Sequence, residues 1–174
     1  MVLVPFDWRG GGEVLEALAA RLGGVFRVRA QVNAGAANLG ECFDAGRGQY
    51  ESGRVLARLG AVDDARWVLG VTSADLFLPV LKFVIGEACL GGRTAVVSTF
   101  RLGDGADVSG SLWPRLVKEA VHELGHCHGL VHCSDGRCVM FASRVAEDVD
   151  WKDETFCPEC ERLVEEARAG LVGC

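Results

Sequence analysis

Apolar residues follow two spacings along this chain, one typical of strands and one typical of helices. Short apolar runs bounded by glycine or polar residues indicate buried strands, and strict alternation indicates a strand that is buried on one face. The strands predicted in this way are Val2–Phe6, Phe26–Val32, Trp67–Val71, Val80–Cys89 and Thr94–Phe100. The last two flank Leu90-Gly91-Gly92-Arg93, which is a hairpin signal.

Apolar residues that recur every three or four positions predict helices between and after these strands. The predicted helices are Glu13–Leu22, ended by Gly23 and Gly24, then Gln49–Leu59, a long helix with Pro114 in its first turn, and Pro158–Ala169. Two glycine-rich segments, Asn33–Gly48 and Leu102–Ser111, are predicted loops. Three glycines, Gly10 to Gly12, follow the first strand, but their spacing favours a turn over a phosphate-binding loop. The pattern predicts an α/β (α+β) fold.

The long helix separates apolar residues from two histidines. At about 100° per residue, its apolar residues share one broad face, and His122 and His126 fall on the opposite side. Residues four apart on a helix lie on one face, so these two imidazoles can bind one metal ion. Gly129 can take the left-handed conformation that ends a helix, and this lets the chain turn back and present His132.

Three neutral imidazoles leave the fourth position of a tetrahedral zinc ion open to water, which is the catalytic arrangement. Glu123 lies beside the first histidine and is placed to act as general base on that water. A chance H-E-x-x-H is common, but the longer H-E-x-x-H-x-x-G-x-x-H with a following methionine is far more specific. The pattern therefore predicts a hydrolytic zinc site on His122, His126 and His132.

Four cysteines predict a second zinc site. Cys133 and Cys138 are spaced C-x4-C, and Cys157 and Cys160 follow eighteen residues later as C-P-E-C. Two such pairs are typical of a closed structural site with four thiolates. The alternatives are two disulfides or four unrelated buried thiols.

Together the two motifs resemble those of the archaemetzincins, a metzincin family with the pattern HExxHxxGxxHCx4CxMx17CxxC. This chain has sixteen residues rather than seventeen between Met140 and Cys157. The resemblance implies a mixed twisted sheet with a backing helix and an active-site helix, an apolar floor under the zinc formed by Met140, and a substrate-aligning edge strand. Thr94–Thr99 is the candidate for that strand, with a plain buried strand as the alternative.

The resulting hypothesis is a single catalytic domain, 1–174, with an N-terminal subdomain, 1–129, and a C-terminal subdomain, 130–174, that binds the structural zinc. We expect a zinc metallopeptidase with two zinc ions per chain. Its mechanism would be Glu123-assisted attack of zinc-bound water on a peptide or protein substrate. The rival hypothesis is a zinc-stabilised binding module without hydrolytic activity.

Composition adds few constraints. The net charge of −6 argues against sequence-independent binding of nucleic acid. Met1–Phe6 lacks the basic start of a signal peptide, and no apolar stretch approaches transmembrane length, so we expect a cytoplasmic monomer with no membrane contact. Cysteines in such a compartment favour metal binding over disulfides.

Several residues receive no catalytic role from the sequence. Cys127 falls on the apolar face of the long helix and is predicted to be a core thiol. His128 points away from the zinc and is predicted to pack or face solvent, and Asp75 is predicted to cap a loop. The sequence assigns no function to Cys42, Cys89 and Cys174, and the only tyrosine, Tyr50, receives no catalytic role.

Overall fold

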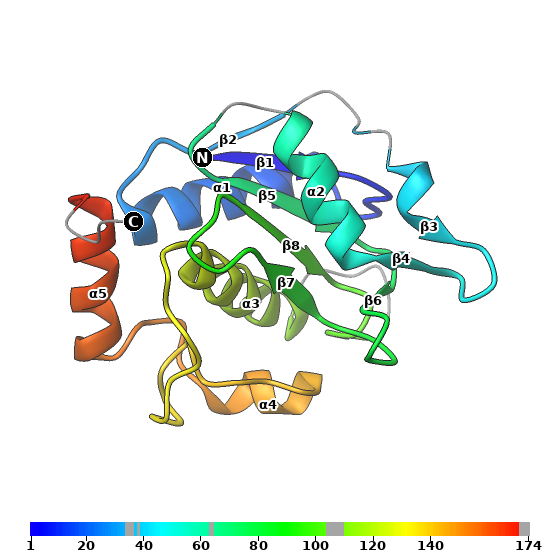
Figure 1. Cartoon of the computed structure of the whole chain (residues 1–174). Helices are drawn as coiled ribbons and strands as arrows, with labels where there is room; N and C mark the ends of the chain where they lie inside the picture. Colours follow the sequence, from blue (N-terminus) through cyan, green and yellow to red (C-terminus); the bar gives the residue numbers. More distant parts are fainter. Residues whose placement is uncertain (34–36, 38, 63–64, 104–109, 171–174) are drawn as a thin grey trace.

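A twisted sheet with helices on both faces forms the centre of the protein (Figure 1). The computed structural model describes residues 1–33, 37, 39–62, 65–103 and 110–170. Within these residues the sheet has five strands in the order β2-β1-β5-β8-β7. They are β1 (Val2–Pro5), β2 (Gln31–Val32), β5 (Val68–Thr72), β7 (Gly86–Ala88) and β8 (Thr94–Ser98). All neighbours are parallel except β7, which runs antiparallel to β8 at one edge.

Alternate residues of the inner strands enter two hydrophobic cores. Leu3, Leu69 and Val97 point to the face that is covered by α1 (Gly12–Phe26) and α3 (Leu112–Cys127). Val4, Val68 and Val96 point to the opposite face, covered by α2 (Ser52–Val62). Burial on both faces is the environment that parallel strands require, and it holds α3 firmly against the sheet.

A second, smaller sheet extends from the main one in the described part of the chain. It contains β3 (Phe43–Asp44), β4 (Gln49–Glu51) and β6 (Leu76–Phe77), and a 3-10 turn, Gly40–Cys42, precedes it. Strand β4 pairs antiparallel with β3 and parallel with β6. The chain between β6 and β7 then returns to the edge of the main sheet.

The chain after α3 contains little regular structure. Two helices, α4 (Ala146–Trp151) and α5 (Pro158–Arg168), are separated by loops. Backbone hydrogen bonds join the loops to each other, as from Cys133 N to Met140 O at 2.9 Å and from Val139 N to Thr155 O at 3.0 Å. None of the helices in the described ranges is both long and apolar enough to cross a membrane.

The structure corrects the predicted end of the first helix. Helix α1 continues through Gly23 and Gly24 to Phe26, and Arg27 (φ 50°) closes it by donating from its amide N–H to their carbonyls. Phe26 is wholly buried, and burial of this ring outweighs the weak helix propensity of two glycines. The predicted strand Phe26–Val32 is therefore wrong over its first half, and only Gln31–Val32 pairs.

Three further predictions change. The first residues of the predicted helix Gln49–Leu59 form β4, and the helix begins at Ser52. Thr94–Thr99 is not an edge strand, because β8 lies between β5 and β7, so β7 is the edge. The strands near Val2 and Trp67, the antiparallel pairing of the hairpin and the last helix are confirmed. The predicted strand Val80–Cys89 is wrong over its first six residues, because only Gly86–Ala88 pairs with β8. The predicted loops at 33–48 and 102–111, like Cys174, fall partly or wholly outside the described residues.

Candidate metal centres

Helix α3 brings three imidazoles together with a following loop. His122 and His126 lie one turn apart, with their Nε2 atoms 3.1 Å from each other. His132 enters from the loop, with its ring centroid 5.3 Å from that of His122 and 5.1 Å from that of His126. One nitrogen of each ring lies within 4.8 Å of the others. Nitrogens at these separations can surround one ion at the 2.0–2.1 Å that is typical of zinc–imidazole bonds.

Gly129 turns the chain so that His132 can face the helix. Its φ of 87° is left-handed, where a side chain would be strained. Its amide donates to His126 O at 2.9 Å, and the amide of Leu130 donates to Gly125 O at 3.1 Å. These bonds satisfy the last carbonyls of α3 and reverse the chain direction.

Backbone carbonyls fix the tautomers of the two helical histidines. His122 Nδ1 lies 2.9 Å from Val139 O, and His126 Nδ1 lies 2.7 Å from Leu130 O. A carbonyl only accepts, so each Nδ1 carries the proton and each Nε2 keeps a free lone pair. Burial lowers the pKa of His126 and, further, that of His122, with Lys152 adding to the effect. Both rings are therefore neutral near pH 7, as metal binding requires.

Glu123 lies beside these imidazoles and against the edge strand. Its side chain is buried, and a Cβ atom added to Gly86 of β7 would lie only 2.5 Å from its Oε1. Burial raises the pKa of Glu123 well above its usual range, and the carboxylates of Glu119 and Glu87 act in the same direction. Gly86 therefore provides the space that this carboxyl group occupies.

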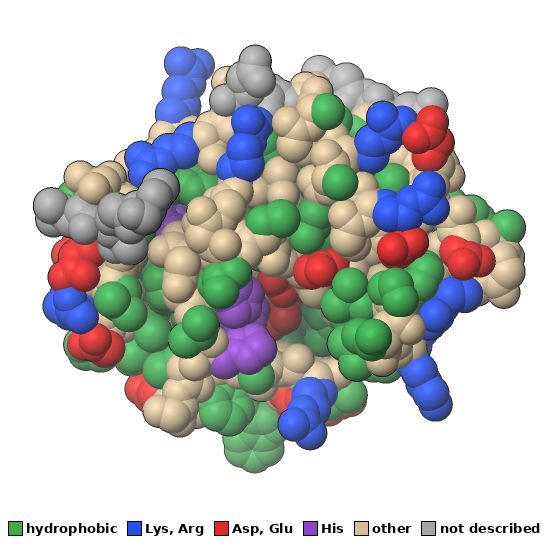
Figure 2. Space-filling view, viewed as in Figure 1, with side chains coloured by type: hydrophobic (Ala, Val, Ile, Leu, Met, Phe, Trp, Pro, Cys, Tyr) green, Lys and Arg blue, Asp and Glu red, His purple; other side chains and the backbone are tan. Residues whose placement is uncertain are grey.

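The three histidines and Glu123 line a cleft of about 570 Å³. Residues 81–88 form one wall, and residues of α3, His132, Ser143 and Arg144 supply the rest of the lining. Figure 2 shows the histidines at a hollow of this face, with acidic atoms beside them and hydrophobic side chains around. The hollow is open to solvent on this face.

Met140 packs against the helix that carries His122 and His126. It is fully buried, and a Cβ atom added to Gly125 would lie 2.4 Å from its sulfur. The thioether thus packs directly on the backbone of α3 between Leu124 and His126. Its flexible, polarisable side chain fills the space next to this helix backbone.

A buried ion pair also supports the site, and the sequence analysis missed it. Lys152 Nζ lies 2.8 Å from Glu119 Oε1, donates to Phe141 O at 3.2 Å and lies 3.4 Å from His122 Nδ1. Ser143 Oγ lies 3.4 Å from the same Glu119 oxygen. The pair therefore joins α3, the loop after Met140 and the end of α4. In the sequence, Lys152 stands in a charged run that resembles solvent-exposed chain.

The four predicted cysteines also converge. The sulfur atoms of Cys133, Cys138, Cys157 and Cys160 lie within 4.8 Å of one another, and none of the four is in a disulfide. The arrangement suits tetrahedral thiolate coordination of one zinc ion, with no position left for a substrate.

Protonation of these thiols depends on their position. Cys157 is the N-cap of α5, and hydrogen bonding from the Cys160 amide lowers its pKa. Burial raises the pKa of Cys138 and Cys160. A cation between the sulfurs would offset the cost of ionising these buried thiols. The geometry therefore fits a bound metal better than four isolated thiols.

The remaining candidates lie elsewhere. Cys127 is a buried thiol 3.4 Å from Thr94 O, as predicted for the core. His128 stacks between Phe26 and Trp67, at 4.8 Å and 4.3 Å, and does not join the three-histidine cluster. The hydroxyl of Tyr50 donates to Asp7 at 2.6 Å, outside the cleft lining. Cys42 is buried, and Cys89 is exposed.

An α/β sheet whose active-site helix and following loop present three imidazoles, a buried glutamate and a methionine defines a metzincin-like zinc metallopeptidase. The model of peptidase family M54 matches residues 30–166. The chain belongs to this family, the archaemetzincins.

Solved structures and curated relatives agree. An archaemetzincin from Archaeoglobus fulgidus is 46% identical over 121 residues, which cover 69% of this chain and 71% of that protein. The crystal structure of the Methanopyrus kandleri archaemetzincin superposes with a TM-score of 0.85 at 35% identity, covering 97% and 94% of the two chains. That of the A. fulgidus protein, complexed with malonate, gives 0.79 at 38% identity, covering 94% and 99%. The predicted family, fold class and enzyme class are confirmed, and zinc is the expected metal of the family.

Proposed function

We propose that this chain hydrolyses peptide bonds at the His122–His126–His132 site, with Glu123 as general base. The observation that carries the proposal is the convergence of three imidazole nitrogens beside a buried carboxyl group in an open cleft. When bound there, zinc supplies Lewis-acid chemistry, because it lowers the pKa of water towards about 7 and polarises a carbonyl.

Glu123 transfers a proton from the attacking water to the leaving amine. One carboxylate oxygen accepts a proton from the attacking water, and the same group then donates it to the nitrogen of the leaving amine. Its position beside the three imidazoles, buried in the cleft, places the carboxyl group where both transfers would occur. The carboxyl group lies against Gly86 of the edge strand, in the space that the missing side chain of Gly86 leaves.

We further propose that the protein holds two zinc ions, the second on the four thiolates. This second ion would link the loop at Cys133 and Cys138 to the start of α5. In this proposal residues 130–174 form a C-terminal subdomain that the structural zinc organises, beside an N-terminal subdomain of residues 1–129.

The test is peptide hydrolysis by purified protein before and after chelation with 1,10-phenanthroline, followed by zinc add-back. The probe is a peptide mixture whose new termini are identified by mass spectrometry. We expect cleavage that disappears on chelation and returns with zinc. Zinc-loaded protein that binds peptides without cleaving any would contradict the proposal and favour the non-hydrolytic binding module.

A further inference from the structure

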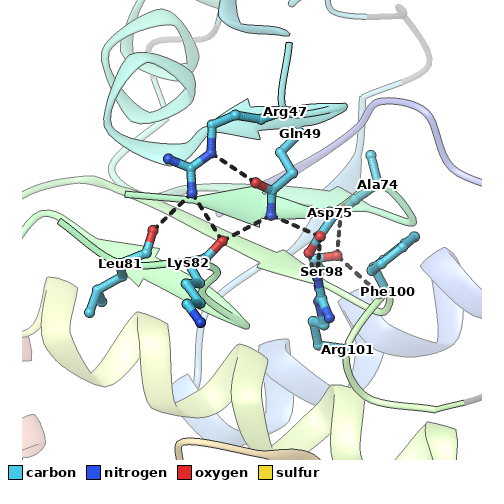
Figure 3. A network of polar contacts seen from close by, with 9 residues as sticks. All are labelled: Arg47, Gln49, Ala74, Asp75, Leu81, Lys82, Ser98, Phe100 and Arg101. Carbon is cyan, nitrogen blue, oxygen red and sulfur yellow. Dashed lines mark hydrogen bonds and ion pairs between the residues drawn. The ribbon is translucent and has the colours of Figure 1, made fainter. Parts of the chain in front are cut away.

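One wall of the catalytic cleft is an irregular segment held from behind by a polar network. Leu81, Lys82 and Phe83 lie between β6 and β7, and all three line the cleft. No helix or strand of the described chain includes them. Figure 3 shows Arg47 and Gln49 on one side of Leu81 and Lys82, with Asp75 and Arg101 beside them.

Arg47 and Gln49 bind the backbone of the wall. Arg47 Nη2 donates to the carbonyls of Leu81 and Lys82, at 3.2 Å each, and Arg47 Nε donates to Gln49 Oε1 at 3.0 Å. Gln49 Nε2 donates to Lys82 O at 3.1 Å. The carbonyl of Lys82 therefore accepts from two side chains, one of them almost wholly buried.

Asp75 and Arg101 complete the support. Gln49 Nε2 also donates to Asp75 Oδ2 at 2.8 Å, and Arg101 donates to both Asp75 oxygens, at 3.0 and 2.5 Å. The Arg101 guanidinium then lies 4.5 Å from the centre of the Phe83 ring. Bidentate pairs of this kind are geometrically specific. Each of the three wall residues is thus fixed by the network before any substrate arrives.

The side chain of Lys82 points away from Arg47 and Gln49. In Figure 3 its side chain extends from the network towards α3, and it is exposed. Within the described chain its ammonium makes no hydrogen bond or ion pair, whereas Lys152, the other lysine near the cleft, is fully paired with Glu119. A fixed backbone reduces the conformational cost of using this cation in binding.

We propose that Lys82 is a specificity-determining residue that binds a carboxylate of the peptide substrate, and that Arg47, Gln49, Asp75 and Arg101 are its positioning residues. The inference rests on the proposed peptidase function, since it assigns a substrate class to the same cleft. An Asp or Glu side chain supplies this carboxylate in the interior of a peptide, and the free C-terminus supplies it at the end.

A preference for basic rather than acidic substrate side chains also has a physical basis in this cleft. Glu87 lines the cleft, and its Oε2 is buried without a donor among the described residues. If this oxygen governed recognition, a basic side chain would be preferred. Arg144, the other exposed cation of the lining, belongs to the loop after Met140 rather than to the wall, so it would act at a different substrate position.

The test uses a positional-scanning peptide library in which each position in turn is Glu, Gln or Lys among randomised neutral residues. Both free and amidated C-termini are included, which separates the two sources of a carboxylate. We expect the parent to prefer Glu over Gln by roughly tenfold at one position, as for a hydrogen bond to a charged group. Lys82→Met should abolish that ratio while neutral peptides are still cleaved, and Lys82→Glu should reverse it towards Lys.

Two control variants test whether the Glu preference depends on Lys82 and on its supporting residues. Arg144→Met should keep the Glu preference at the Lys82 position. Gln49→Leu, which removes a support without touching the cleft, should raise KM for the Glu peptides with little change in kcat. A parent without Glu preference, a preference for Lys, or a ratio unaffected by Lys82→Met would each overturn the inference. Binding of the same peptides to zinc-loaded Glu123→Gln tests it even without cleavage, so its failure and that of the proposed hydrolysis are distinguishable.

Discussion

Lys152 and Glu119 form an ion pair of 2.8 Å, with side-chain exposures of 0% and 4%. A buried pair is costly to desolvate, and removing one partner leaves an uncompensated charge in the core. Lys152→Ala should therefore lower the free energy of unfolding by about 3–5 kcal/mol.

The double variant Lys152→Met/Glu119→Leu separates the pair's stability from its role in the site. An apolar replacement of both partners is often neutral for stability, so this variant should unfold near the parent's denaturant midpoint. It should nevertheless hold zinc on the histidines less tightly, because the loop that carries Val139 O and Phe141 O loses one of its contacts with α3 and then holds His122 less firmly. Unchanged zinc affinity in a stable double variant would show that the pair is only structural.

Gly86→Ala tests the space beside Glu123. The added Cβ would lie 2.5 Å from the carboxylate oxygen, so the carboxyl group must move. A displacement near 1 Å can cost roughly 10²-fold in rate. We expect zinc content to stay at the parent's level while kcat falls by that order. Gly60→Ala is the matched control, since its Cβ meets only a Thr94 methyl at 3.8 Å. Full activity in Gly86→Ala would show that the position of Glu123 is not critical.

Two zinc sites of different type should differ in lability. Metal analysis of metal-replete protein should find two zinc ions per chain, and mild chelation should remove the ion of the open histidine site first. Cys157→Ser should lose the other ion, and each 2 kcal/mol of lost stability would lower Tm by roughly 4–8 °C. The exposed Cys89 serves as control, because Cys89→Ser should keep both ions. An unchanged zinc count and Tm in Cys157→Ser would remove the case for a structural zinc.

The zinc-free protein should lose stability in mild acid through its histidines. Burial lowers the pKa of His122 and His126 from 6.5, so below that pH the unfolded chain binds protons that the folded chain does not. The free energy of unfolding from this source therefore falls as pH drops below about 6.5. Glu123, whose pKa is raised, acts in the opposite direction. The difference between the parent and His122→Gln, measured by urea unfolding from pH 7.5 to 5.5, isolates the histidine contribution. A parent no more acid-sensitive than the variant would contradict it.

The two metal clusters were predictable because their geometry is local. A helical period places His122 beside His126, and Gly129 supplies the one conformation that returns His132 to them. The two cysteine pairs likewise carry their spacing in the sequence. Such signals need no knowledge of the sheet.

What the sequence did not reveal depends on contacts between distant segments. Gln49 meets Asp75 and Lys82 only after β4 and β6 pair. Lys152 resembles a surface residue until α4 packs against α3. Helix α1 continues through two glycines because Phe26, at its end, packs against His128 and Phe156. Local propensity is a weak guide wherever tertiary burial decides.

The most direct test of the central claim is zinc content beside peptide hydrolysis for Glu123→Gln. This side chain is not among the three converging nitrogens, and glutamine keeps its size while removing the base. We expect the variant to retain the zinc ions and melting temperature of the parent and to lose roughly 10²–10⁴-fold in kcat. A zinc-loaded Glu123→Gln protein that cleaves peptides as fast as the parent would contradict it.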